Sequence, residues 1–191
     1  MSQALVGSAK TLGCSERTLR RYVNEGLLRG RRISTGRGLE LSRAEESYLG
    51  DHWELLSSLR RSLRTERAVR LAVLFGSVAV GEDEQGSDVD LLVIHQHPTP
   101  VALVGVQLRL GRALHGRPVD VIGLEQAEAM PSLLADVLRE GRVLVDRDGQ
   151  WQSLCGRRDE VLAAAEHEER TTAVRARAAV VAARERIAAA A

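Results

Sequence analysis

Three aspartates are the residues whose type and spacing could do chemistry. Asp88 and Asp90 stand two apart at the mouth of an apolar run, and residues two apart in a strand point to the same side. Asp120 opens a second short apolar run, so a neighbouring strand could deliver its carboxylate to the same place, although a lone Asp there is often only a turn residue. Clustered carboxylates suit Mg²⁺ and would repel one another without a cation. We therefore predict Asp88, Asp90 and Asp120 as catalytic, metal-binding residues around two Mg²⁺ ions, an arrangement that supports in-line nucleotidyl transfer.

A glycine-serine pair precedes this acidic pair in the chain. Gly76 and Ser77 follow the apolar run 69–75, which reads as a buried strand, and they would open a helix. Backbone N–H groups and the positive end of the helix dipole then face the turn, and glycine lets an anion approach the backbone closely. The Ser77 hydroxyl can donate to a phosphate oxygen. We predict a nucleotide-binding role for Gly76 and Ser77.

The combined pattern resembles a known family. Ten residues separate Ser77 from Asp88, and Gly-Ser followed at this distance by Asp-x-Asp resembles the signature of the DNA polymerase β nucleotidyltransferase superfamily. The fuller form, Gly-Ser-x-Ala-x-Gly and then Ser-Asp-x-Asp, resembles the minimal nucleotidyltransferases of bacteria and covers roughly residues 68–147. By this resemblance Ser87 is a further nucleotide-binding residue. Val80 stands where that group commonly has Arg, so the chain lacks this cation near the phosphates.

The resemblance implies an activity and a set of partners. Minimal nucleotidyltransferases move a nucleoside monophosphate from an NTP to an acceptor, and many are antitoxins that adenylylate a HEPN-type toxin on tyrosine. It implies Mg²⁺-dependent transfer of NMP, AMP from ATP, to a protein or RNA hydroxyl, with two Mg²⁺ ions as cofactors. The alternative is a catalytically weak DNA-binding transcriptional regulator whose transferase domain only binds nucleotide or a partner toxin, because a fold does not fix an acceptor.

The first 41 residues predict a winged helix-turn-helix. A short helix would end at Gly13, and Ser15 would cap a second helix that Gly26 stops. The stretch resembles the winged helix-turn-helix of MerR-like regulators, with a wing formed by a hairpin after residue 29. We expect contacts with operator DNA, although a solvated basic loop beside a helix pair is the alternative. The predicted DNA-binding residues are Arg17, Arg20, Arg21, Arg31 and Arg32.

The rest of the chain predicts the elements that hold these residues. Residues 42–67 read as a connecting helix that begins with a capping box at Ser42 and Glu45. Residues 68–150 alternate strands and helices, which favours an α/β (α+β) nucleotidyltransferase fold with a small mixed sheet flanked by helices. Residues 151–191 read as a C-terminal helix, continuous from residue 157, because they are rich in Ala, Arg and Glu.

Charge is distributed unevenly along the chain. The net charge of +1 consists of +6 over residues 1–70, −6 over residues 71–150 and +1 over the remainder. A basic segment joined to an acidic one favours a polyanion partner for the first and bound cations in the second. We find no secretion signal and no long apolar run, so we expect a cytoplasmic protein without a membrane partner. The sequence leaves homo-oligomer formation open.

Overall fold

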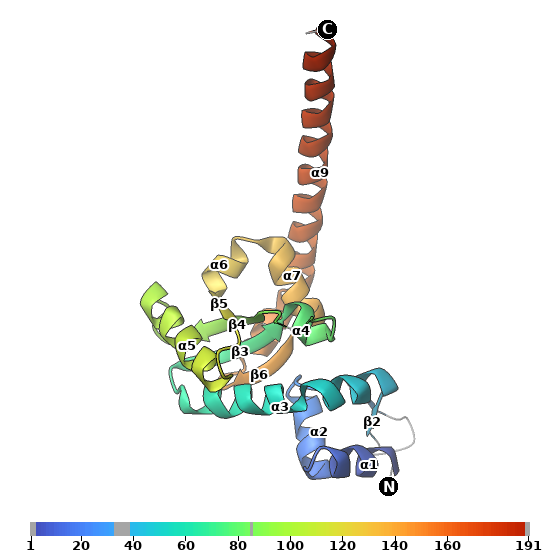
Figure 1. The fold of residues 1–191 in the computed structure, drawn as a ribbon, viewed down its shortest axis with the longest axis vertical. Helices are drawn as coiled ribbons and strands as arrows, with labels where there is room; N and C mark the ends of the chain where they lie inside the picture. Colours follow the sequence, from blue (N-terminus) through green and yellow to red (C-terminus); the bar gives the residue numbers. More distant parts are fainter. Residues whose placement is uncertain (1–2, 33–38, 85, 190–191) are drawn as a thin grey trace.

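The computed structural model describes residues 3–32, 39–84 and 86–189. At its centre lies a four-stranded mixed sheet in the order β5-β4-β3-β6 (Figure 1). β3 runs antiparallel to both β4 and β6, whereas β4 and β5 are parallel. The strands are β3 (Val69–Phe75), β4 (Val89–His95), β5 (Val119–Gly123) and β6 (Arg142–Asp146). The small mixed sheet expected from the sequence is confirmed.

Helices cover both faces of this sheet, because successive side chains of β3 point to opposite sides. Ala72 and Leu74 pack in one cluster with α3 (Arg43–Thr65) and α5 (Pro100–Ala113). Leu71 and Val73 pack in a second cluster with α6 (Leu124–Glu128), α7 (Pro131–Glu140), α8 (Gln150–Gly156) and α9 (Arg158–Ala189). A strand buried on both faces is apolar along most of its length, which is why residues 69–75 and 90–95 could be predicted as strands. The short helix α4 (Gly76–Val80) follows β3 directly.

The N-terminal unit contains two helices and a two-stranded sheet. α1 (Gln3–Thr11) and α2 (Glu16–Asn24) are joined by a turn in which Gly13 has a φ of +62°. The Ser15 side chain caps α2 by accepting from the N–H of Thr18, as predicted. β1 (Gly30–Arg32) and β2 (Leu39–Leu41) pair antiparallel, but the turn of the predicted wing, residues 33–38, lies outside the described residues.

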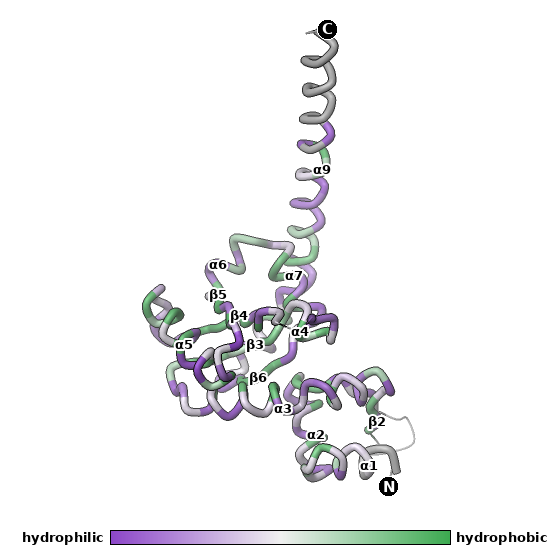
Figure 2. The backbone as a smooth tube through the Cα atoms, viewed as in Figure 1, coloured by the Kyte–Doolittle hydropathy of each residue, from purple (hydrophilic) through white to green (hydrophobic). Residues whose placement is uncertain are grey.

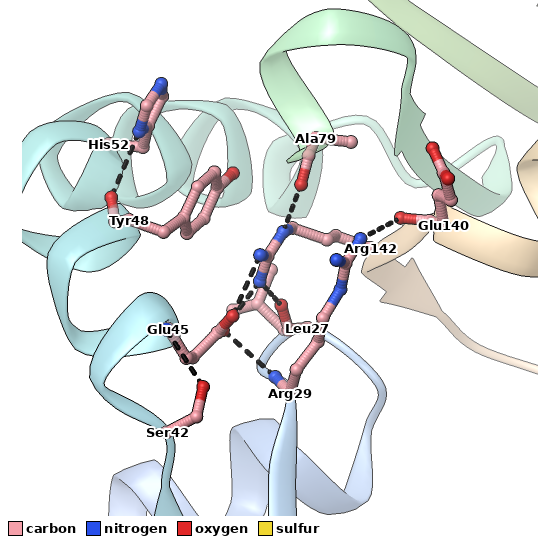
Figure 3. A network of polar contacts seen from close by, with 9 residues as sticks. All are labelled: Leu27, Arg29, Ser42, Glu45, Tyr48, His52, Ala79, Glu140 and Arg142. Carbon is pink, nitrogen blue, oxygen red and sulfur yellow. Dashed lines mark hydrogen bonds and ion pairs between the residues drawn. The ribbon is translucent and has the colours of Figure 1, made fainter. Parts of the chain in front are cut away.

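A buried arginine joins this N-terminal unit to the sheet (Figure 3). Arg142 of β6 is 1% exposed, and its guanidinium donates to both carboxylate oxygens of Glu45, at 2.6 and 2.9 Å. It also donates to the carbonyls of Leu27 in the N-terminal unit and Ala79 in α4. Its guanidinium carbon lies 3.6 Å from the ring centroid of Tyr48, an arrangement that favours a cation–π contact.

The capping box predicted at the start of α3 is half wrong. Ser42 does cap the helix by accepting from the N–H of Glu45. The Glu45 side chain does not take part in the box, however, because it bonds Arg142 and accepts from the N–H of Arg29. A buried guanidinium needs a counterion more than the first turn of a helix needs a second cap.

The long helix predicted from residue 157 is confirmed as α9, whereas the residues before it, which were assigned to the same C-terminal helix, form the separate short helix α8. Val161 and Ala165, near the start of α9, are buried against the sheet side. The helix then extends away from the rest of the molecule, where its described residues are mostly hydrophilic (Figures 1 and 2). Within the described residues, no helix combines the length and apolarity that crossing a membrane requires.

Candidate functional site

The predicted acidic residues lie together where β4 and β5 begin. Asp90 and Asp120 are directly paired in the parallel register of these two strands. On its other side Asp90 is paired with Phe75, the last residue of β3. Asp88 lies immediately before β4. The structure therefore brings the three predicted carboxylates to one end of the sheet, beside the turn that contains Gly76.

Gly76 touches this acidic group. Its φ is +72°, and a Cβ at this position would lie 2.5 Å from Oδ2 of Asp90. Such a separation is too short for a carbon–oxygen contact, so only glycine permits the turn and the carboxylate to lie this close. The N-cap of α4, Phe75, has no side-chain hydrogen bond, and the first turn of α4 therefore lacks a side-chain cap.

The electrostatics of the site fit cation binding. Burial raises the pKa of Asp90, and the negative charges of Asp120 and Asp88 raise this pKa further. Asp88 and Asp120 are themselves exposed to solvent. The half-buried carboxylate of Asp90 is thus destabilised in its charged form by its two neighbours, and a divalent cation would relieve that repulsion.

The donor set suits Mg²⁺, although its side chains are not gathered around a single point. Among the described residues, no three His, Cys, Asp or Glu side chains stand close enough together to hold a metal ion as they lie. Asp88 and Asp120 are exposed, so rotation of their side chains can bring their oxygens towards Asp90. Carboxylate oxygens are the ligands that Mg²⁺ prefers.

The predicted nucleotide-binding serines have different surroundings. Ser77 is half-buried in the first turn of α4, and its hydroxyl has no hydrogen-bond partner among the described residues. The Ser87 hydroxyl accepts from the N–H of Glu84, within the loop between α4 and β4. Ser77 therefore has its whole hydroxyl available to a ligand, whereas Ser87 also holds its own loop in shape.

A comparison with protein families identifies the segment that carries this site. Residues 57–150 match the family model described as Polymerase beta, Nucleotidyltransferase. These residues are a nucleotidyltransferase domain. The match includes Gly76, Ser77 and all three aspartates, and it extends over the last turns of α3 and the whole sheet.

Solved structures similar to about two thirds of the chain were also found. A toxin-antitoxin structure with AMP-PNP has 21% sequence identity and a TM-score of 0.46, over 65% of this chain and 95% of that chain. A tri-AMPylated Shewanella oneidensis HEPN toxin in complex with MNT antitoxin has 19% identity and a TM-score of 0.42, over 66% and 95% of the two chains. No curated protein matches the chain.

Three residues that the sequence did not single out fix the loop of the nucleotidyltransferase domain that leads to Asp88. Asp83, in this loop, accepts from His52 of α3 at 2.7 Å and from Arg117 at 2.9 Å. Arg117 also donates from Nε to the carbonyl of Ser87, which directly precedes Asp88. These bonds to His52 and Arg117 lower the pKa of Asp83 against the opposing effect of its burial.

Arg117 thereby connects the two segments of the nucleotidyltransferase domain that carry the predicted acidic residues. It stands three residues before Asp120, while its guanidinium holds the residue before Asp88. The Arg117-Pro118 pair preceding an apolar strand was the only sequence signal for this role, and it does not identify a partner. We call Asp83, His52 and Arg117 the loop clamp.

The arginines predicted to bind DNA lie outside the nucleotidyltransferase domain. Arg17, Arg20 and Arg21 are on α2, where Arg20 pairs with Glu16 and Arg21 with Glu25, each at 3.7 Å. On the hairpin, Arg31 is strongly exposed and lies 3.4 Å from Glu40. The backbone of Arg32 belongs to β1, but its side chain lies outside the described part of the chain.

Proposed function

We propose that this chain is a Mg²⁺-dependent nucleotidyltransferase that moves NMP, AMP from ATP, to a protein or RNA hydroxyl. One observation carries the proposal: Asp90 and Asp120 are paired in register next to Gly76, with Asp88 close enough for its charge to raise the pKa of Asp90. A cluster of three carboxylates beside a glycine turn can bind divalent cations and the triphosphate that they coordinate at the same site.

In the transfer, the acceptor oxygen forms a bond to the α-phosphorus of the NTP. The bond between this phosphorus and the oxygen that bridges the α- and β-phosphates breaks, and pyrophosphate leaves with the electron pair. The acceptor hydroxyl gives up its proton to solvent water. Asp88, Asp90 and Asp120 would hold two Mg²⁺ ions, which when bound supply charge neutralisation and hydroxyl activation. The Gly76 turn and the Ser77 hydroxyl hold the phosphates. The loop clamp keeps Asp88 and Asp120 in place.

We further propose that the acceptor is a HEPN-type toxin and that the chain is its antitoxin. The support is the sequence motif, which resembles that of minimal nucleotidyltransferases over the same residues that form the site. The N-terminal unit, as a winged helix-turn-helix, would bind operator DNA through the arginines of α2. A nucleotidyltransferase domain joined to a DNA-binding unit fits an antitoxin that represses its own operon.

Label transfer from α-labelled ATP tests the enzymatic proposal. The chain is incubated with Mg²⁺ and a purified HEPN-type toxin, and wild type is compared with the Asp88→Ala/Asp90→Ala variant. We expect labelled toxin only with wild type. Asp136→Ala is a matched control, because Asp136 is an exposed carboxylate on α7 that pairs with Arg139 and is not one of the three aspartates of the site. Label on the toxin with the double variant would refute the catalytic assignment.

A salt titration tests DNA binding separately. Replacing Arg17, Arg20 and Arg21 by Gln should flatten the dependence of operator affinity on salt by roughly one unit of log–log slope for each lost phosphate contact. An unchanged slope would remove the recognition-helix assignment and leave the enzymatic proposal intact.

One observation favours a second candidate function. Val80 ends α4 at a position where the resemblance leads us to expect Arg, so this cation is missing near the phosphates. A DNA-binding regulator whose transferase domain binds nucleotide or toxin without turnover would tolerate that change. Binding of Mg²⁺ and ATP by wild type, without label transfer to any co-purified protein, would select this function.

A further inference from the structure

A cavity of about 480 Å³ lies where the N-terminal unit meets the sheet, away from the acidic site. Its walls are the end of α2, the second half of α3, β6 and the start of α8. Asp146, at the end of β6, is paired with Leu71 near the start of β3, whereas Asp90 is paired with Phe75 at the end of β3. The cavity therefore opens at the opposite end of the sheet from the carboxylates.

The acidic groups of the cavity wall are already engaged. Glu25 accepts from Nη2 of Arg60 at 2.8 Å through one oxygen and faces Arg21 through the other. The two oxygens of Asp146 accept from the backbone N–H groups of Gln150 and Trp151. The carboxylates of the cavity wall are therefore already bonded within the protein before a ligand enters.

Two side chains of the same wall, Arg64 and Trp151, have donors without a protein partner in the described part of the chain. Arg60 is 8% exposed, and its Nε is buried without a hydrogen-bond partner. Among the described residues, neither the Arg64 guanidinium nor the Trp151 indole N–H has a partner. The Arg64 guanidinium and the Trp151 indole N–H therefore remain free to donate to an acceptor that a ligand supplies.

The fixed charge of the wall favours an anion. Arg147 adds a third guanidinium, held in place by the carbonyls of Leu63, Arg64, Glu66 and Val69. With Arg60 and Arg64 it outweighs the two carboxylates, so the lining carries a net positive charge. The half-buried Trp151 contributes a flat apolar surface beside these charges.

We propose that this cavity is a binding site for a small phosphate-bearing molecule, separate from the transferase site. Its volume falls within the range of small-ligand sites, roughly 300–1,000 Å³. The ligand's phosphate accepts from the exposed Arg64 guanidinium, in a wall that also carries the positive charges of Arg60 and Arg147, and the rest of the ligand lies against Trp151. Because Asn24 and Glu25 belong to the N-terminal unit, the ligand contacts both parts of the chain. This inference does not depend on the proposed function.

Trp151 fluorescence in the full-length chain provides a local test. A Trp53→Phe background leaves Trp151 as the single indole, and Asp88→Ala/Asp90→Ala with EDTA removes metal-dependent binding at the acidic site. Inorganic phosphate and AMP are the probes. We expect a saturable change with each probe, and tighter binding of AMP because only AMP also covers the indole.

The matched variants are Arg64→Glu and Arg61→Glu. Both arginines are exposed on α3, but only Arg64 lines the cavity. Arg64→Glu should weaken binding by about tenfold or more, since it replaces a charged donor by a like charge. Arg61→Glu should leave binding unchanged, and equal unfolding midpoints would show that both variants fold.

Two results would overturn the proposal. The first is the absence of a saturable change with either probe up to roughly 10 mM, a concentration at which even weak specific sites fill. The second is an Arg64-dependent signal from duplex DNA when phosphate and AMP give none, which would assign the cavity to a nucleic-acid surface instead.

Discussion

Replacing Gly76 by Ala should disable the acidic site while leaving the fold intact. The backbone has a φ of +72° here, and an alanine in this region costs roughly 1–2 kcal/mol of stability. The added methyl carbon would lie 2.5 Å from Oδ2 of Asp90, where real contacts are at least 3.0 Å. The carboxylate or the turn must therefore move by about 0.5 Å or more.

That displacement sets the size of the expected effect. Disturbing a group that orients a metal ligand typically costs about 10- to 100-fold in metal affinity. This range corresponds to a loss of ~1.4–2.7 kcal/mol in the free energy of Mg²⁺ binding. The backbone cost is a separate loss, which appears in the free energy of unfolding. Calorimetric titration of Mg²⁺ in the presence of a non-hydrolysable ATP analogue measures the first quantity, and urea unfolding measures the second.

Gly149→Ala is the matched control. Gly149 has a φ of +68°, but nothing lies within 4 Å of a Cβ built there. It should lose about the same stability as Gly76→Ala, roughly 1–2 kcal/mol, with no change in Mg²⁺ affinity. Equal Mg²⁺ affinities for wild type and both variants would refute the conclusion that the Gly76 turn positions Asp90.

Three further changes test other parts of the structure. Arg117→Lys loses the planar fork that holds the loop clamp, so kcat should fall by about tenfold with little change in the KM for ATP, and an unchanged kcat would contradict the clamp. Glu45→Gln leaves Arg142 buried without a counterion and should cost about 3–5 kcal/mol in urea unfolding; a loss below ~1 kcal/mol would mean that the pair is solvated. The raised pKa of Asp90 means that the folded chain binds its proton more tightly than the unfolded chain does, so stability from this group grows as pH falls through the raised pKa towards the pKa of the unfolded chain. Asp90→Asn should therefore raise the unfolding midpoint at neutral pH without Mg²⁺ and reduce its pH dependence, and a lowered midpoint would reverse the sign of this argument.

The sheet and the acidic group were predictable from local patterns. Strands β3 and β4 are buried on both faces, and such strands leave continuous apolar runs in a sequence. The two-residue period of a strand was enough to place Asp88 and Asp90 on one side. Only the parallel pairing of β4 with β5, which the structure supplies, puts Asp120 next to Asp90.

Polar contacts between distant segments were not predictable. Glu45 and Arg142 are 97 residues apart, and the role of Glu45 was mistaken because its position also fits a local capping pattern. His52 and Asp83 are 31 residues apart on a helix and a loop that show no shared period. Hydrophobic periodicity reports which face of an element is buried, but it does not report which buried charge will meet which.

The buried Arg142 limits how the chain can be shortened. A fragment that begins at residue 57, where the family match starts, would retain Arg142 and lose both Glu45 and the Leu27 carbonyl. It would uncover the Arg142 side chain and a stretch of the sheet edge, since Leu27, Glu45 and Tyr48 cover the guanidinium and the N–H of Val143 bonds Gly26 in the intact chain. The family match over residues 57–150 is therefore shorter than the segment that we expect to fold on its own. We expect such a fragment to require the N-terminal unit.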